Sequence, residues 1–193
     1  MSRGWVVALL ALPLLGSCRP RGSGEPPAVE LQEYPIGGDF ELAGREPFHL
    51  TRALDGRVGL LFFGYTVCPD VCPMTLSKLA QVYAALGDDG ERVVTVFVSL
   101  DPERDSPEQI REYLSFYGVN AVGTTGSREE LDALVHRYGG SYTLEPVDSA
   151  MEYLVSHASY VYLLDPSGRV RHLFSHLDDA ARIEAGVRRL LDP

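Results

Sequence analysis

Apolar positions along this chain follow two periods, one typical of buried strands and one typical of helices. The runs Val58–Tyr65 and Val93–Leu100 are almost continuously apolar and show no helical stripe, as expected of strands covered on both faces. After the first run, apolar residues recur at helical spacing as far as Gly87, which predicts an amphipathic helix ending near that glycine. The stripe consists of Leu76, Leu79, Tyr83 and Leu86, and Pro73 suits the first helical turn.

Two helix starts are marked by capping boxes, in which a serine is followed three residues later by glutamine or glutamate. Ser106 pairs with Gln109, with Pro107 at the first helical position, and Ser127 pairs with Glu130. Each box precedes an apolar stripe at helical spacing, so each predicts a helix that packs on a core. The stripes are Ile110, Tyr113, Leu114 and Tyr117, and then Leu131, Leu134, Val135 and Tyr138.

The C-terminal part of the chain predicts a hairpin and a last helix. The strand-like runs Tyr160–Leu164 and Val170–Phe174 flank the turn sequence Asp165-Pro166-Ser167-Gly168. A final amphipathic segment follows, with Ile183, Val187, Leu190 and Leu191 toward the core.

Two short apolar runs near the N-terminus, Phe40–Leu42 and Phe48–Leu50, predict a small β-hairpin in which His49 faces outward. The predicted order of elements is typical of an α/β fold with a central mixed sheet flanked by helices on both faces. Two cysteines at the first strand-to-helix junction make the arrangement thioredoxin-like. The fold alone does not define a function.

The first residues are typical of an export signal, with Arg3 before the apolar stretch Trp5–Leu15. That stretch is too short to span a bilayer well. The ending Leu15-Gly16-Ser17-Cys18 resembles a bacterial lipobox, which predicts a lipid on Cys18 and a domain on the extracytoplasmic side of an envelope membrane. An ordinary signal peptide with an incidental cysteine is the alternative. The predicted division is a lipoprotein signal peptide over 1–17, a flexible tether over 18–35 and one thioredoxin-like domain over 36–193.

Charge and cysteine count restrict the possible partners and the possible use of the cysteines. A net charge of −10 argues against nucleic acid as a partner. The chain has three cysteines, so a lipid on Cys18 would leave Cys68 and Cys72 as a pair. In an exported protein such a pair tends to become a disulfide unless something protects it.

The stretch Cys68-Pro69-Asp70-Val71-Cys72-Pro73 places two thiols at a helix entrance, where backbone N–H groups and the helix dipole favour the thiolate. Three residues separate the cysteines, whereas the thioredoxin motif has two. Side chains four positions apart can converge on one ion or form a disulfide. Two thiolates are an incomplete copper site, and His157, in a connection before the predicted hairpin, is the candidate third ligand. A solvated side chain is the alternative for this histidine.

Three separated motifs resemble the Sco/SenC family over about residues 35–191. They are Cys68–Pro73, Leu100-Asp101-Pro102-Glu103-Arg104-Asp105-Ser106-Pro107, and Val155-Ser156-His157 followed by Tyr162–Gly168. The resemblance implies a membrane-anchored copper chaperone of thioredoxin-like fold that helps to assemble the CuA centre of cytochrome c oxidase subunit II. It places the ligands for Cu(I) or Cu(II) on Cys68, Cys72 and His157.

The resemblance also leaves points open. The family commonly has an aspartate where this chain has Ser156, so the hydrogen bonding around the histidine is expected to differ. An aspartate of the second motif has been connected with copper handling in the family, which makes Asp101 a candidate for a supporting or transfer role and Asp105 a weaker one. The alternative is that Asp101 caps a turn and Asp105 favours a helix start.

A thiol-disulfide oxidoreductase that keeps acceptor cysteines reduced is the second hypothesis, with Cys68 and Cys72 as its redox-active pair. His157 discriminates between the two, because a dithiol exchanger has no need of it. An upstream periplasmic copper donor or thiol reductant would complete either scheme. A peroxidase is a third reading, which the cysteine context does not specifically support.

Overall fold

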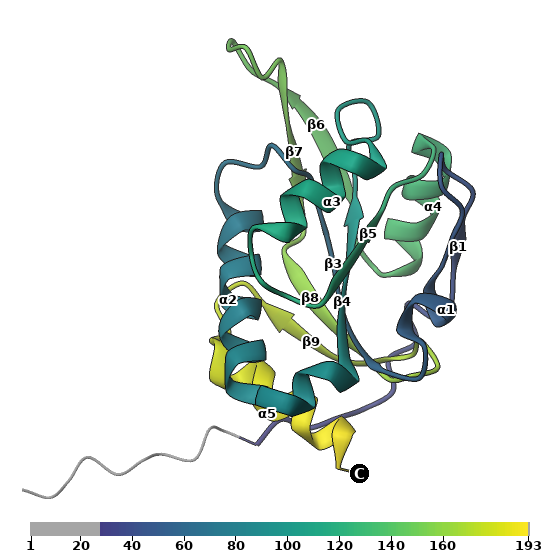
Figure 1. The fold of residues 1–193 in the computed structure, drawn as a ribbon. Coiled ribbons are helices and arrows are strands. Elements are labelled where there is room, and N and C mark those ends of the chain that lie inside the picture. The colour runs from purple at the N-terminus through teal and green to yellow at the C-terminus, as the bar shows by residue number, and fades with distance from the viewer. Residues whose placement is uncertain (1–27, 193) are drawn as a thin grey trace, which may run out of the picture.

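The computed structural model describes residues 28–192, which build a mixed five-stranded sheet in the order β5-β4-β3-β8-β9 (Figure 1). The first three of these strands run parallel, β8 runs antiparallel to them, and β9 forms a hairpin with β8 and so runs in the direction of the first three. Every residue of β3 and β4 is buried, which explains their continuous apolar runs. The strands are β3 (Val58–Gly64), β4 (Val93–Ser99), β5 (Ala121–Thr124), β8 (Tyr160–Leu164) and β9 (Val170–Ser175).

Helices cover both faces of this sheet, as predicted. One face buries Leu76, Ile110 and Val187 from three different helices, and the other buries Leu54 and Leu134 from two more. The helices of the first face are α2 (Val71–Leu86), α3 (Pro107–Ser115) and α5 (Ala180–Leu191). Those of the second face are α1 (Leu50–Leu54) and α4 (Arg128–Arg137), and a 3-10 turn, η1 (Gly87–Arg92), follows α2.

The helix starts lie where the sequence places them. In both capping boxes the serine side chain accepts from the backbone of the third helical residue, and the Gln109 or Glu130 side chain accepts from the backbone N–H of Ser106 or Ser127. The α2 helix ends before Gly87, whose positive φ of 58° suits a residue without a side chain.

The N-terminal hairpin is also present, formed by β1 (Glu41–Leu42) and β2 (Phe48–His49). However, Leu50 begins α1 and does not extend the strand. His49 is only partly exposed, because its Nδ1 lies 2.9 Å from a carboxylate oxygen of Glu41 on the paired strand.

Two further elements differ from the prediction. Strand β5 was not expected, and a second hairpin, β6 (Tyr142–Pro146) with β7 (Tyr153–His157), forms a two-stranded sheet of its own. His157 is therefore the last residue of a strand, whereas the sequence analysis places it in a connection. Four of the five β6 residues are exposed, so this strand lacks the apolar alternation by which strands are recognised.

The tether predicted over 18–35 must end earlier, because part of it packs on the domain. Val29 is fully buried, and the backbone N–H groups of Gln32 and Tyr34 donate to carbonyls of β9 at 3.0 and 3.2 Å. Cys18 and the predicted signal peptide lie outside the described residues. Within residues 28–192, none of the helices combines the length and the apolar character needed to cross a membrane.

The Val29 side chain is buried in the core between α5 and the sheet, close to Gly186. Shortening it should therefore destabilise the domain. We expect Val29→Ala to lower the free energy of unfolding by about 1.5–3 kcal/mol, measured by urea denaturation. Glu30→Ala is the matched control, since Glu30 is exposed on the same segment. Equal stability of both variants and the unmodified protein would mean that this segment does not pack as described.

Candidate metal centre

The two cysteines lie at the carboxyl end of β3, where the chain turns into α2. Cys72 is in the first turn of α2 and is 1% exposed, whereas Cys68 lies in the preceding loop and is about half-buried. Both are free thiols. The Cys68 N–H donates to the Tyr65 carbonyl at 3.3 Å, which curls the loop toward the end of the strand.

A hydrogen bond between the two sulfurs divides their acidity unequally. The Cys72 thiol donates to Cys68 and, together with the backbone N–H groups of Asp70 and Cys72 and the Tyr65 hydroxyl, lowers the pKa of Cys68 to about 5 in spite of its burial. The same bond, followed by burial and the charge on Cys68, raises the pKa of Cys72 far above that of an ordinary thiol. At neutral pH the pair therefore holds one thiolate, on Cys68, and one proton, on Cys72.

Tyr65 is buried beside this thiolate. Burial, followed by the negative charge on Cys68, raises the pKa of Tyr65 to about 12, so its hydroxyl keeps its proton and remains a donor. The ring also meets His157 edge to face, with centroids 6.5 Å apart. Tyr65 thus contacts both halves of the candidate site.

His157 presents a neutral imidazole to the same region. Its Nδ1 lies 3.1 Å from the Ala158 carbonyl, which can only accept, so Nδ1 carries the hydrogen and Nε2 keeps its lone pair. Burial lowers the pKa of His157, which favours the neutral form. Cys68 and His157 line one surface hollow of about 240 Å³, and Cys72 and His157 line a smaller one beside it.

The donor set fits copper in its chemistry. Two sulfurs and an imidazole nitrogen form a soft to borderline set, and the thiolate and the free Nε2 are the forms that bind metals. The structure brings the three predicted ligands to one end of the molecule. Within residues 28–192 it does not arrange three or more His, Cys, Asp or Glu side chains as a ready-made metal cluster.

The two aspartates of the second motif have different partners, and neither lines the hollow beside Cys68. Asp101 is fully buried and accepts from Arg104 and from the Tyr153 hydroxyl. Asp105 is 1% exposed and accepts from the N–H and hydroxyl of Thr66, at 2.9 and 2.5 Å, and from Ser99. Burial raises the pKa of Asp105. Because Thr66 begins the cysteine loop, Asp105 is joined to the cysteine loop more directly than Asp101.

Gly64 is a site residue that the sequence analysis missed. A Cβ at this position would lie 2.7 Å from the Cys72 sulfur and 2.7 Å from the Phe97 ring, so only glycine leaves room for the buried thiol. A glycine inside a strand pattern signals such a close approach, and this signal was available in the sequence. Tyr65, Thr66 and Arg104 were missed as well. Arg104 stands inside the second motif, whereas no local pattern marks the other two.

Other histidines lie apart from these residues. His136 is exposed in the last turn of α4. His172 is on β9, where its Nδ1 lies 3.1 Å from the Glu30 carbonyl and its ring packs on Phe174. His176 follows the end of that strand.

A family model described as SCO1/SenC matches residues 28–192, which are all the residues that the structure describes. The chain belongs to the SCO1/SenC family. This family member is 32% identical over 143 residues to an SCO2-like protein of Rickettsia felis, covering 72% of this chain and 69% of the relative.

Solved structures of the family confirm the thioredoxin-like fold. Copper-bound ScoI of Bradyrhizobium japonicum is 32% identical with a TM-score of 0.70, covering 80% of this chain and 99% of that one. Apo Sco1 of Thermus thermophilus is 35% identical with a TM-score of 0.70, covering 83% and 94%. The mixed sheet and the flanking helices are therefore those of known Sco proteins.

Reduced Cys68 should react with iodoacetamide at half its maximal rate near pH 5, since the rate follows the thiolate fraction. Tyr65→Phe removes one donor to the thiolate and should move this midpoint to higher pH. Tyr160→Phe, at the edge of the same region, is the control and should leave the midpoint unchanged. A midpoint above pH 8 in the unmodified protein would contradict the assigned thiolate.

A pair of variants, Gly64→Ala and Gly59→Ala, separates the effect of strand packing on stability from the effect of Cys72 on the pKa of Cys68. Both add a Cβ that meets a neighbour at 2.7 Å, the Cys72 sulfur in one case and Leu54 in the other. We expect each to lower the free energy of unfolding by about 1–3 kcal/mol in urea. Only Gly64→Ala should also raise the pKa of Cys68 in the alkylation profile, by displacing the Cys72 donor. An unchanged profile in Gly64→Ala would show that the sulfurs tolerate the displacement.

Proposed function

We propose that this protein binds copper through Cys68, Cys72 and His157 and delivers it to the CuA centre of cytochrome c oxidase subunit II. The observation that carries the proposal is that the Cys68 thiolate and the imidazole of His157, with Nε2 unprotonated, line one hollow. The copper-bound Bradyrhizobium relative supports it. We further propose that residues 1–17 are a signal peptide and that lipid on Cys18 anchors the domain outside a bacterial envelope membrane.

The unequal acidity of the two thiols suggests an order of events. Copper is the cargo, and Cys68 is the donor that is already ionised when the ion arrives. Cys72 then loses its proton to solvent, because the positive ion replaces that proton as the group stabilising both sulfurs. His157 binds through Nε2 without a protonation change. Release follows by exchange of these ligands for the thiolates and imidazoles of the acceptor.

A thiol-disulfide oxidoreductase is the second candidate, and the exposure of the two cysteines favours it. Cys68, more exposed and ionised, would attack a disulfide of the acceptor and release one of its sulfurs as thiolate. Buried Cys72 would then lose its proton and attack Cys68, forming the Cys68–Cys72 disulfide and releasing the second acceptor sulfur. An upstream thiol reductant would restore the dithiol, as a periplasmic copper donor would reload the chaperone.

Copper titration of the reduced protein should separate these functions. His157→Ala should weaken copper affinity at least tenfold, about 1.4 kcal/mol, because it removes one of three ligands. Exchange with a disulfide-containing acceptor peptide should stay unchanged, because it needs only the two cysteines. His136→Ala, an exposed histidine on α4, is the matched control. Equal copper affinity of His157→Ala and the unmodified protein would refute the copper proposal, and undetectable exchange would refute the second one.

A further inference from the structure

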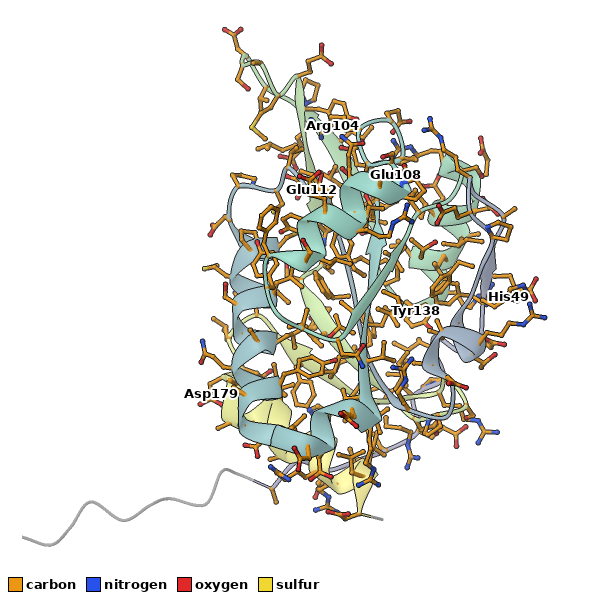
Figure 2. All side chains as sticks on the ribbon, in the orientation of Figure 1. His49, Arg104, Glu108, Glu112, Tyr138 and Asp179 are labelled. Carbon is orange, nitrogen blue, oxygen red and sulfur yellow. The ribbon has the colours of Figure 1, made fainter. Side chains whose placement is uncertain are left out.

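The turn between β4 and α3, residues 101–105, contacts both halves of the candidate site. At one end Asp105 accepts two hydrogen bonds from Thr66, which begins the cysteine loop. At the other end Arg104 reaches β7, the strand that ends at His157. Figure 2 shows Arg104 at the end of the molecule where the β6–β7 hairpin lies.

Arg104 makes three contacts with the start of β7 and the turn just before it. Its Nη1 donates to the carbonyls of Met151 and Tyr153, at 2.6 and 3.1 Å, and its guanidinium lies 3.7 Å from the centre of the Tyr153 ring. Its Nε donates to Asp101, which also accepts from the Tyr153 hydroxyl. Asp101, Arg104 and Tyr153 therefore form a closed ring of contacts between the turn and the start of β7.

Arg104 also faces the cysteine side. Its guanidinium carbon is 5.9 Å from the centre of the Tyr65 ring, and Tyr65 lines the same hollow as Cys68. Its Nη2 is buried and has no hydrogen-bond partner among residues 28–192. One cation thus lies between Tyr153, which begins β7, and Tyr65, which lines the hollow beside Cys68.

The β6–β7 hairpin depends on such side-chain contacts because its strands form a separate sheet. Val155 is buried in the core at the middle of β7, and Tyr142, paired with His157, donates to Asp132. Four residue steps separate Tyr153 from His157, about 13 Å of extended chain. Contacts at Tyr153 therefore fix the direction in which β7 delivers its last residue.

We propose that Arg104 is a positioning residue that holds His157 in register with the cysteine loop, acting through Tyr153 and Asp101. The inference rests on the proposed role of His157 as a copper ligand. It gives Asp101 a supporting role in which its carboxylate orients Arg104 and does not touch the ion.

Hydrogen exchange of the full chain without copper tests the structural half of this proposal. Arg104→Met keeps the length of the side chain but removes its charge and donors. We expect amide exchange over residues 153–157 to become about tenfold faster or more, with β4 unchanged. Arg111→Met is the matched control, because Arg111 pairs with Glu46 and Glu108 on the exposed surface. Equal exchange in Arg104→Met and the unmodified protein would overturn the proposal.

Copper titration tests the functional half. Arg104→Met should weaken copper affinity roughly 10- to 100-fold, as losses around a metal ligand do. The double variant with His157→Ala should bind no more weakly than His157→Ala alone, because Arg104 acts through His157. Additive losses would overturn the proposal.

Two further results remain decisive. If Arg104→Met does not fold, Tyr153→Phe replaces it in both measurements, since it removes only the hydroxyl bond to Asp101, and the same outcomes apply. If the unmodified protein binds copper no better than His157→Ala, the proposed copper function fails. Amide hydrogen exchange over residues 153–157 still decides whether Arg104 positions β7.

Discussion

The interaction between the Cys72 thiol and the Cys68 thiolate is the one around which this end of the molecule is organised. It lets one half-buried and one buried thiol hold a single negative charge, which an isolated thiol in either place would resist. The arrangement requires that Cys72 be buried and stay close to Cys68. Gly64 provides the space for its sulfur, and the Phe97 ring closes the same space from β4.

Aromatic packing beneath the cysteine loop keeps the end of β3 rigid. Phe63 meets the rings of Tyr138 and Tyr162 edge to face, with centroids 5.6 and 5.9 Å apart. The hydroxyl of Tyr162 donates to the Tyr138 carbonyl, and that of Tyr138 donates to the Gly38 carbonyl. Residues far apart in the sequence therefore fix the strand from which the loop begins, so the positions of the cysteines depend on the whole domain.

The parts of the fold that could be predicted are those encoded over a few residues. The buried runs of β3 and β4 and the two capping boxes are local signals, and both were read correctly. The β6–β7 hairpin was missed because its stability comes from Arg104 and from buried Val155, not from its own pattern. The cysteine motif is a local signal and is visible in the sequence. The link between Asp105 and the cysteine loop is a long-range contact, so the sequence does not favour Asp105 over Asp101. The partner of Asp105, Thr66, lies 39 positions away, and no local rule connects them.

The course of the first described residues has a geometric consequence. They run along β9 and enter the fold at the end of the sheet opposite to the β6–β7 hairpin (Figure 1). In the proposed anchored protein, the chain therefore approaches from the lipid on one side, while the sulfurs and the imidazole open on the other. Such a domain presents its copper site away from the membrane surface. An acceptor in the same membrane would then meet the site either through a domain of its own that stands off the membrane, or after rotation of this domain relative to its anchor.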